Sequence, residues 1–209
     1  TGPGGEETRE AADPLKELEA LIASFRPAHP SPEPLMNGGA VGYIGYDAIR
    51  YVENLPDKTR DDLGIPDIDL MFYDHLIVFD HIRRTLRVIA LVEPGADPEA
   101  AYHAACARIR ATVGCICGSA PEAAIDIEEG GEAGFTPESN ISRGAFESAV
   151  VKAKEYIIAG DIFQVVLSQR LSVDRAVDPF PVYRVMRVVN PSPYMFFLDT
   201  GACALVGSS

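Results

Sequence analysis

The chain has 209 residues, of which 47% are hydrophobic and 23% are charged, a composition typical of a protein that can bury a core. Acidic residues outnumber basic residues 31 to 18, and the net charge of −13 argues against nucleic acid as a partner, because phosphate backbones are also negative. No apolar run approaches the roughly 20 residues that span a bilayer, and the acidic N-terminus has no signal-peptide layout. These features predict a cytoplasmic protein without membrane contact.

The N-terminal part of the chain predicts one helix and one strand. Residues 1–12 are polar and acidic and are predicted to be a disordered lead-in. Asp13 offers an N-cap directly before a proline, so an amphipathic helix is predicted over about 14–25. Residues 38–53 (GGAVGYIGYDAIRYVE) predict a strand that turns at Gly45 into a short helix. Their glycines match no nucleotide-binding spacing and are better explained by close backbone packing.

Two runs rich in β-branched and aromatic residues follow. Residues 69–81 (DLMFYDHLIVFDH) and 85–93 (TLRVIALVE) predict an antiparallel hairpin. An alanine-rich helix is then predicted from Asp97 to about Val113. Residues 114–138 are rich in glycine, alanine and glutamate and predict a linker.

This linker is predicted to separate an N-terminal α+β region, residues 13–113, from a second region, residues 139–209. In the second region, Ser142 is predicted to cap a helix that Gly160 ends. The remaining residues predict three further elements: a strand over about 163–171, a helix from Asp178 to about Val188, and a hairpin of 194–198 with 203–206. Hairpins with flanking helices predict an α+β fold with mainly antiparallel sheet.

Patterns of residue type give few candidate catalytic groups. No catalytic triad, thiol–imidazole pair or zinc-binding spacing is visible, and the four cysteines fit no disulfide framework. In the predicted strand, Gln164 and Arg170 share one face, which either lines a ligand cavity or is simply exposed. Prolines in residues 190–197 stiffen a stretch that either presents aromatic side chains to a flat ligand or feeds an ordinary strand.

Two dense segments resemble a known family. Gly160–Arg170 (GDIFQVVLSQR) and Asn190–Phe197 (NPSPYMFF) are similar to the large subunit of anthranilate synthase, one of the chorismate-utilising enzymes. The resemblance extends upstream and covers nearly all of residues 36–209. It implies that the chain forms a truncated part of the family's β-sandwich fold. Because the chain begins with Thr1 and stops after an apolar run, we expect an internal fragment. The resemblance implies that the family's metal-binding and catalytic residues lie downstream of Ser209, so we expect this fragment to be inactive alone.

The resemblance implies a lyase that converts chorismate and ammonia to anthranilate and pyruvate, the first step of tryptophan biosynthesis. A glutamine amidotransferase subunit is the expected partner that supplies the ammonia. Mg²⁺ is the implied cofactor, because a divalent cation would hold the ring carboxylate of dianionic chorismate and stabilise charge as the ring hydroxyl leaves. Its ligands are expected downstream of Ser209, so no metal ligand is assigned within the chain.

Position 164 distinguishes branches of the family. Relatives that form isochorismate or salicylate carry a lysine at the matching position, where it activates water as a general base. A glutamine cannot take up a proton at neutral pH. Gln164 therefore favours ammonia over water as the nucleophile and is the candidate active-site residue. The large component of aminodeoxychorismate synthase also uses ammonia and is an alternative, although the two segments resemble the anthranilate branch better.

The same resemblance implies feedback inhibition by tryptophan. In anthranilate synthases, the stretch that matches Pro193, Tyr194 and Met195 contributes to the tryptophan site, so these three are candidate tryptophan-binding residues. The other half of that site is a Leu-Glu-Ser motif, which this chain lacks. This absence argues against tryptophan binding by the chain alone. A non-catalytic tryptophan-binding module is nevertheless a further alternative, recognisable by tryptophan binding without chorismate turnover.

Overall fold

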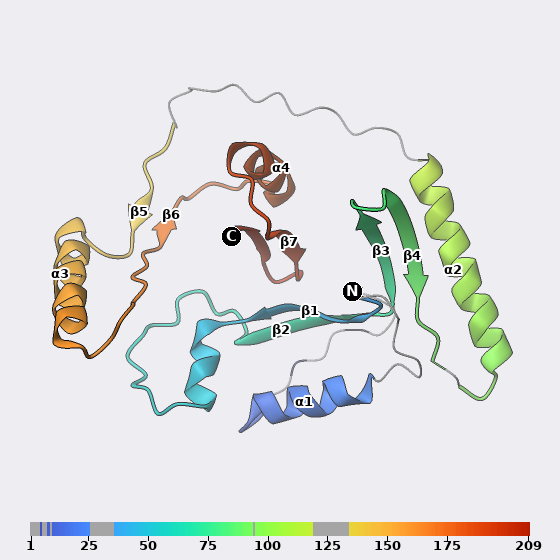
Figure 1. The fold of residues 1–209 in the computed structure, drawn as a ribbon, viewed down its shortest axis with the longest axis horizontal. Coiled ribbons are helices and arrows are strands. Elements are labelled where there is room, and N and C mark those ends of the chain that lie inside the picture. Colours follow the sequence, from blue (N-terminus) through green and yellow to red (C-terminus); the bar gives the residue numbers. More distant parts are fainter. Residues whose placement is uncertain (1–4, 6–7, 9, 26–35, 94, 119–133) are drawn as a thin grey trace. The chain divides into compact units, whose positions relative to one another are not determined.

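The structure is a computed structural model that describes residues 5, 8, 10–25, 36–93, 95–118 and 134–209. Contacts divide the chain into two compact units, one of residues 1–124 with 190–209 and one of residues 125–189. In chain order the elements are α1 (Pro14–Ser24), β1 (Gly39–Ile44), the 3-10 helix η1 (Tyr46–Tyr51), β2 (Ile68–Tyr73), β3 (His75–Asp80), β4 (Thr85–Ala90), α2 (Pro98–Gly118), β5 (Glu138–Ser139), α3 (Arg143–Ala159), β6 (Leu171–Ser172), α4 (Pro179–Val189), β7 (Met195–Asp199) and β8 (Ala204–Ser208) (Figure 1).

Helix α1 begins where the sequence predicts. The Asp13 carboxylate accepts a hydrogen bond from the Lys16 amide at 3.2 Å and also pairs with the Lys16 ammonium at 2.8 Å. This capping satisfies one of the amides that a helix start leaves without a partner. At the other end, the Phe25 ring stacks on Phe72 of β2 with a centroid distance of 4.8 Å. Within the predicted lead-in, residues 5, 8 and 10–12 belong to no helix or strand, and the rest lies outside the described residues.

Strands β1 and β2 form an antiparallel pair whose register runs from Gly39 opposite Tyr73 to Ile44 opposite Ile68. The predicted turn at Gly45 is confirmed, since η1 starts directly after it. Two tyrosines hold the loop that leads into β2: Tyr43 Oη of β1 donates to the Pro66 carbonyl at 3.0 Å, and Tyr51 Oη of η1 donates to Asp67 Oδ2 at 2.7 Å. The bond to Asp67 raises the pKa of Tyr51, so the phenol keeps its proton and remains a donor.

The predicted hairpin is confirmed for β3 and β4, with His75 opposite Ala90 and Asp80 opposite Thr85. However, the run 69–81 is not one strand. It breaks at Asp74, so that its first half belongs to β2 and pairs with β1. Alternation of side chains identifies a strand but does not identify its partner, which explains why the sequence pattern misses the break.

Asp80 organises the turn between β3 and β4 and gives a prediction about pH. Its Oδ1 accepts hydrogen bonds from the Arg83 amide at 2.9 Å and from the Ile82 amide at 3.1 Å. The Arg83 bond is the main cause that lowers the pKa of Asp80 from its ordinary value of 3.8. Because the folded-state pKa is lowered, the ionised Asp80 carboxylate stabilises the folded turn above pH 3.8. This stabilisation is lost as the pH falls through the lower pKa of the folded turn.

We therefore expect the Arg83 amide-proton resonance to shift on acidification with a midpoint below 3.8, measured by NMR titration of the labelled chain. The variant Asp80→Asn is the control, because it keeps an acceptor oxygen but has no ionisable proton. Its Arg83 resonance should stay in place over the same pH range. A midpoint at or above 3.8 in the unmodified chain would contradict the role of the carboxylate.

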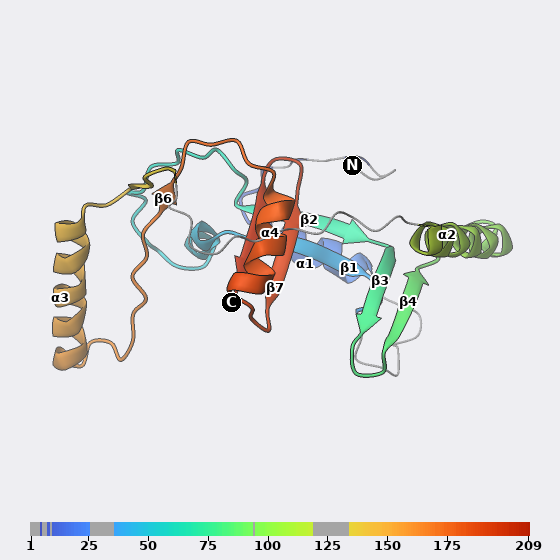
Figure 2. The ribbon, with the colours of Figure 1, turned by 90° about the horizontal axis from the view of Figure 1, so that it is seen from above.

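Helix α2 packs on the hairpin, beside β4 in both views (Figure 1 and Figure 2). Ala105 is buried at 3% exposure. Arg108 pairs with Asp74 at 2.7 Å, and Thr112 Oγ1 lies 3.2 Å from His75 Nε2. The helix continues beyond the predicted end at Val113, since no proline interrupts it before Gly118. The predicted linker, residues 114–138, is thus helical at its start, and its residues 119–133 lie outside the described residues.

The last hairpin, β7 with β8, also belongs to the first unit. Met195 lies opposite Ser208 and Asp199 opposite Ala204, which confirms the predicted hairpin with a shift of its bounds. Leu198 is buried at 9% exposure. Residues 190–209 thus group with the first unit, and the predicted functional division into 13–113 and 139–209 stays a prediction.

In the second unit, the ends of α3 agree with the sequence-based expectation. Ser142 Oγ accepts a hydrogen bond from the Ala145 amide at 3.3 Å and caps the first turn. Gly160 ends the helix with a φ of 83°, a left-handed conformation that suits glycine. Helix α4 also agrees with its prediction. The predicted strand over 163–171 is wrong: only Leu171–Ser172 form a strand, β6, because only these residues pair with another strand, β5.

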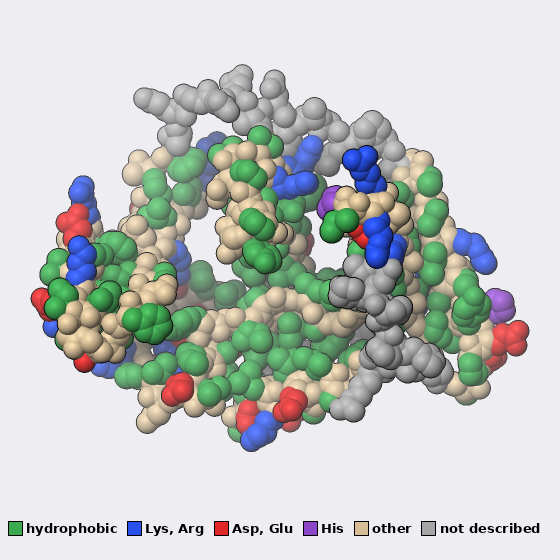
Figure 3. Space-filling view, viewed as in Figure 1, with side chains coloured by type: hydrophobic (Ala, Val, Ile, Leu, Met, Phe, Trp, Pro, Cys, Tyr) green, Lys and Arg blue, Asp and Glu red, His purple; other side chains and the backbone are tan. Residues whose placement is uncertain are grey.

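The α+β class with antiparallel strand pairs and helices is confirmed. Among the described residues, the buried hydrophobic ones are only Ala48, Ala105 and Leu198. Hydrophobic side chains are spread over the visible face in Figure 3. In the described part of the chain, no helix combines the length and apolar character needed to cross a bilayer.

Candidate functional site

The segment that contains Gln164 starts at a fixed turn. The Gly160 amide donates to the Ile157 carbonyl at 3.1 Å, and the Asp161 amide donates to the Tyr156 carbonyl at 3.0 Å. This pair of bonds is a Schellman motif, which satisfies carbonyls at the end of α3 and sets the direction in which the chain leaves the helix. Residues 161–170 then run to β6 without forming a strand of their own.

The far end of the same segment is held by hydrogen bonds to the residues before α3. The Arg170 amide donates to Asn140 Oδ1 at 2.8 Å, and the Asn140 amide donates to the Arg170 carbonyl at 3.0 Å. In addition, Ser139 Oγ donates to Gln169 Oε1 at 3.1 Å. The sequence patterns did not single out Asn140. The only feature that distinguishes it in the sequence is its position two residues before the Ser142 cap.

Between these two ends, the side chains of residues 163–169 are solvent-exposed. Phe163 is 92% exposed, and Val165 is 44% exposed. Gln164 and Arg170 lie in the same segment, and Gln164 is exposed. The structure therefore presents Gln164 on a segment fixed at both ends, and its role in the active site stays a prediction.

The candidate tryptophan residues lie in the other unit, at the start of β7. The Tyr194 amide donates to the Ser209 carbonyl at 3.3 Å, and the Ser209 amide donates to the Tyr194 carbonyl at 3.1 Å. The Tyr194 side chain is 76% exposed, Pro193 is exposed, and Met195 is half-buried opposite Ser208. The backbone of this stretch is thus fixed while its aromatic ring remains accessible.

Ser192 adds a polar group that the sequence patterns did not single out. Its Oγ is buried and has no hydrogen-bond partner in the described part of the chain. A buried hydroxyl without a partner costs free energy unless a further group satisfies it. It lies next to Pro193, one of the three candidate tryptophan-binding residues.

The described residues offer no site for the implied Mg²⁺. They contain no group of three His, Cys, Asp or Glu side chains that could hold a metal ion. His75 is already bonded to Thr112, and no disulfide joins the four cysteines, of which Cys115 and Cys117 are exposed. Chemistry that depends on Mg²⁺ is therefore not assigned to these residues.

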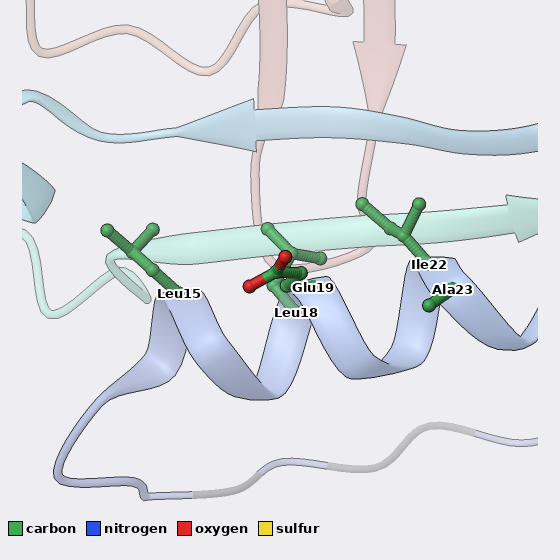
Figure 4. A pocket seen from close by; sticks show the side chains of 5 residues that line it. All are labelled: Leu15, Leu18, Glu19, Ile22 and Ala23. Carbon is green, nitrogen blue, oxygen red and sulfur yellow. The ribbon is translucent and has the colours of Figure 1, made fainter.

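One hollow lies on α1 and is lined by Leu15, Leu18, Glu19, Ile22 and Ala23. Figure 4 shows Leu15, Leu18 and Ile22 projecting from the side of α1 that faces β2. All five lining residues come from one helix, and Glu19 is their only ionisable group. Ligand sites usually combine several elements with converging polar groups, so we assign no ligand to this hollow.

Comparison with known proteins decides the family. A model of chorismate binding enzymes matches residues 3–209. The chain belongs to the chorismate-binding enzyme family. Anthranilate synthase component 1 of Acetivibrio thermocellus is 40% identical to it over 98% of this chain and 42% of that protein. The corresponding protein of Thermus thermophilus is 44% identical over 96% of this chain and 41% of its own length.

The fold comparison agrees. The crystal structure of anthranilate synthase component I from Streptococcus pneumoniae matches with a TM-score of 0.74 at 32% identity, over 94% of this chain and 43% of that one. The resemblance noted from Gly160–Arg170 and Asn190–Phe197 is thereby confirmed. The chain spans about two fifths of the length of these chorismate-binding relatives.

Proposed function

We propose that this chain is part of an anthranilate synthase component I. The observation that carries the proposal is the 40–44% identity to such enzymes over nearly the whole chain. The proposed reaction joins chorismate and ammonia and releases anthranilate, pyruvate and water. We also propose that the strand pairs described above are parts of the larger sheets of a β-sandwich, and that the protein is cytoplasmic.

In this reaction, Gln164 is proposed to line the active site and to bind the reactants through hydrogen bonds, without exchanging a proton with them. A primary amide donates and accepts hydrogen bonds but stays neutral near pH 7, so it does not generate hydroxide from water. This supports ammonia as the nucleophile. We propose that a glutamine amidotransferase subunit supplies the ammonia. Mg²⁺, when bound by residues outside the described set, would supply the charge stabilisation that chorismate requires.

We further propose that tryptophan inhibits the enzyme through Pro193, Tyr194 and Met195. The fixed backbone and the exposed ring of Tyr194 support this proposal, because an aromatic ring can stack on an indole. The neighbouring Ser192 hydroxyl, which lacks a partner among the described residues, is a polar group that such a ligand could satisfy.

The test uses the protein translated from its complete gene, with chorismate, Mg²⁺ and ammonium. We expect anthranilate, detected by fluorescence, and an equal amount of pyruvate, detected with lactate dehydrogenase. Added tryptophan should lower both rates. The 209-residue chain assayed in parallel should form neither product.

The outcomes separate the alternatives. Consumption of chorismate without pyruvate, with an aminated product that keeps the enolpyruvyl group, would identify an aminodeoxychorismate synthase. Tryptophan binding without any chorismate turnover would identify a non-catalytic binding module. Either result would overturn the proposed function.

A further inference from the structure

Helix α3 and the Gln164 segment form a closed loop within the second unit. The chain passes along α3 from Arg143 to Ala159, turns at Gly160 and returns to β6, which pairs with β5 just before the helix (Figure 1). A helix of 17 residues is about 25 Å long at 1.5 Å per residue. The ten returning residues, 161–170, span about 33–36 Å at most when fully extended. The segment therefore has to run back along most of the length of α3, which it does without forming a strand of its own.

Asn140 closes this loop with its side chain. The β5–β6 ladder contains two residue pairs, ending with Ser139 opposite Leu171. At the next position, Asn140 binds both backbone groups of Arg170, and its Oδ1 replaces the carbonyl that a regular strand would present. The replacement is needed because the backbone is already turning into α3, with the Ile141 amide donating to Ser139 Oγ at 3.3 Å.

We propose that Asn140 is a positioning residue for Gln164. The Gly160 turn fixes one end of the segment and Asn140 fixes the other, so the location of Gln164 depends on both. Loss of the Asn140 side chain removes the acceptor of the Arg170 amide and releases this end of the segment. This inference rests on the proposed function, because it assigns Gln164 to the active site.

The experiment uses the protein from its complete gene. In Asn140→Ala we expect kcat for ammonia-dependent anthranilate formation to fall by about tenfold or more, since small misplacements of a catalytic region are costly. The KM for chorismate should change by less than about threefold, because the change affects the reacting geometry more than binding.

Asn140→Asp should restore kcat to within about threefold of the wild-type value, since its carboxylate also accepts from the Arg170 amide. Asn54→Ala, the same change in an exposed loop of the other unit, should leave kcat unchanged.

A second readout does not depend on the reaction. Hydrogen exchange of the Arg170 amide should speed up in Asn140→Ala and stay near the wild-type rate in Asn140→Asp. If the wild-type protein makes no anthranilate, the proposed function fails while this readout still decides whether Asn140 holds the segment. Unchanged exchange or an unchanged kcat in Asn140→Ala would overturn the inference. So would a loss of kcat that accompanies a lowered melting temperature and that Asn140→Asp does not restore.

Discussion

Replacing Gly42 with alanine is expected to lower the free energy of unfolding by about 3 kcal/mol, the upper range for overpacking a close contact. Gly42 lies in β1 opposite Leu70 of β2. A Cβ at this position would collide with the Asp69 carbonyl oxygen and lie 2.8 Å from the Leu70 Cα. These are backbone atoms, so the clash cannot be relieved by rotating a side chain. The strands would have to separate and lose ladder hydrogen bonds.

Urea unfolding of the chain, followed by circular dichroism, measures this effect. Gly114→Ala is a matched control, because Gly114 lies within α2 and the Cβ that alanine adds there would have nothing within 4 Å. That variant should gain about 0.5–1 kcal/mol from the higher helix propensity of alanine. Equal effects of the two substitutions would contradict the contact between Gly42 and β2.

Replacing Gln164 with lysine is expected to lower ammonia-dependent anthranilate formation by about 100-fold or more, in the protein from its complete gene. Lysine replaces a neutral donor and acceptor with a cation that has no acceptor, so hydrogen bonds to the amide oxygen are lost. When deprotonated, the same lysine can also activate water, which competes with ammonia. Anthranilate fluorescence gives the rate, and mass spectrometry identifies any hydroxylated isomer of chorismate.

Val177→Lys is the control for the added charge. Val177 is 57% exposed in the connection between β6 and α4, so a lysine there should be solvated and should change the rate by less than about twofold. If Gln164→Lys retains the wild-type rate of anthranilate formation, Gln164 does not line the active site. In that case the position would not explain the preference for ammonia.

Helix ends were the most predictable part of the fold. Asp13, Ser142 and Gly160 act through bonds to residues only a few positions away, so their roles are visible in the local sequence. The end of α2 was less predictable, because a helix continues until something stops it and no proline stands before Gly118.

Strand pairing was less predictable. The break at Asp74 separates a strand that pairs with β1 from one that pairs with β4, although both halves are similarly rich in apolar and aromatic residues. Similarly, residues 163–170 alternate like a strand but join no ladder among the described residues. Composition and alternation describe a segment's compatibility with a sheet, whereas a strand exists only when another strand supplies its hydrogen bonds.

For the candidate site, the resemblance of two short segments to a known family singled out Gln164 and Pro193–Met195 and indicated the family to which the chain belongs. Only the three-dimensional arrangement revealed that Asn140 holds the backbone of Arg170, thirty residues away. The reason is physical: a cap or a turn satisfies its own neighbours, but the backbone groups of an extended segment must find partners that lie far along the chain.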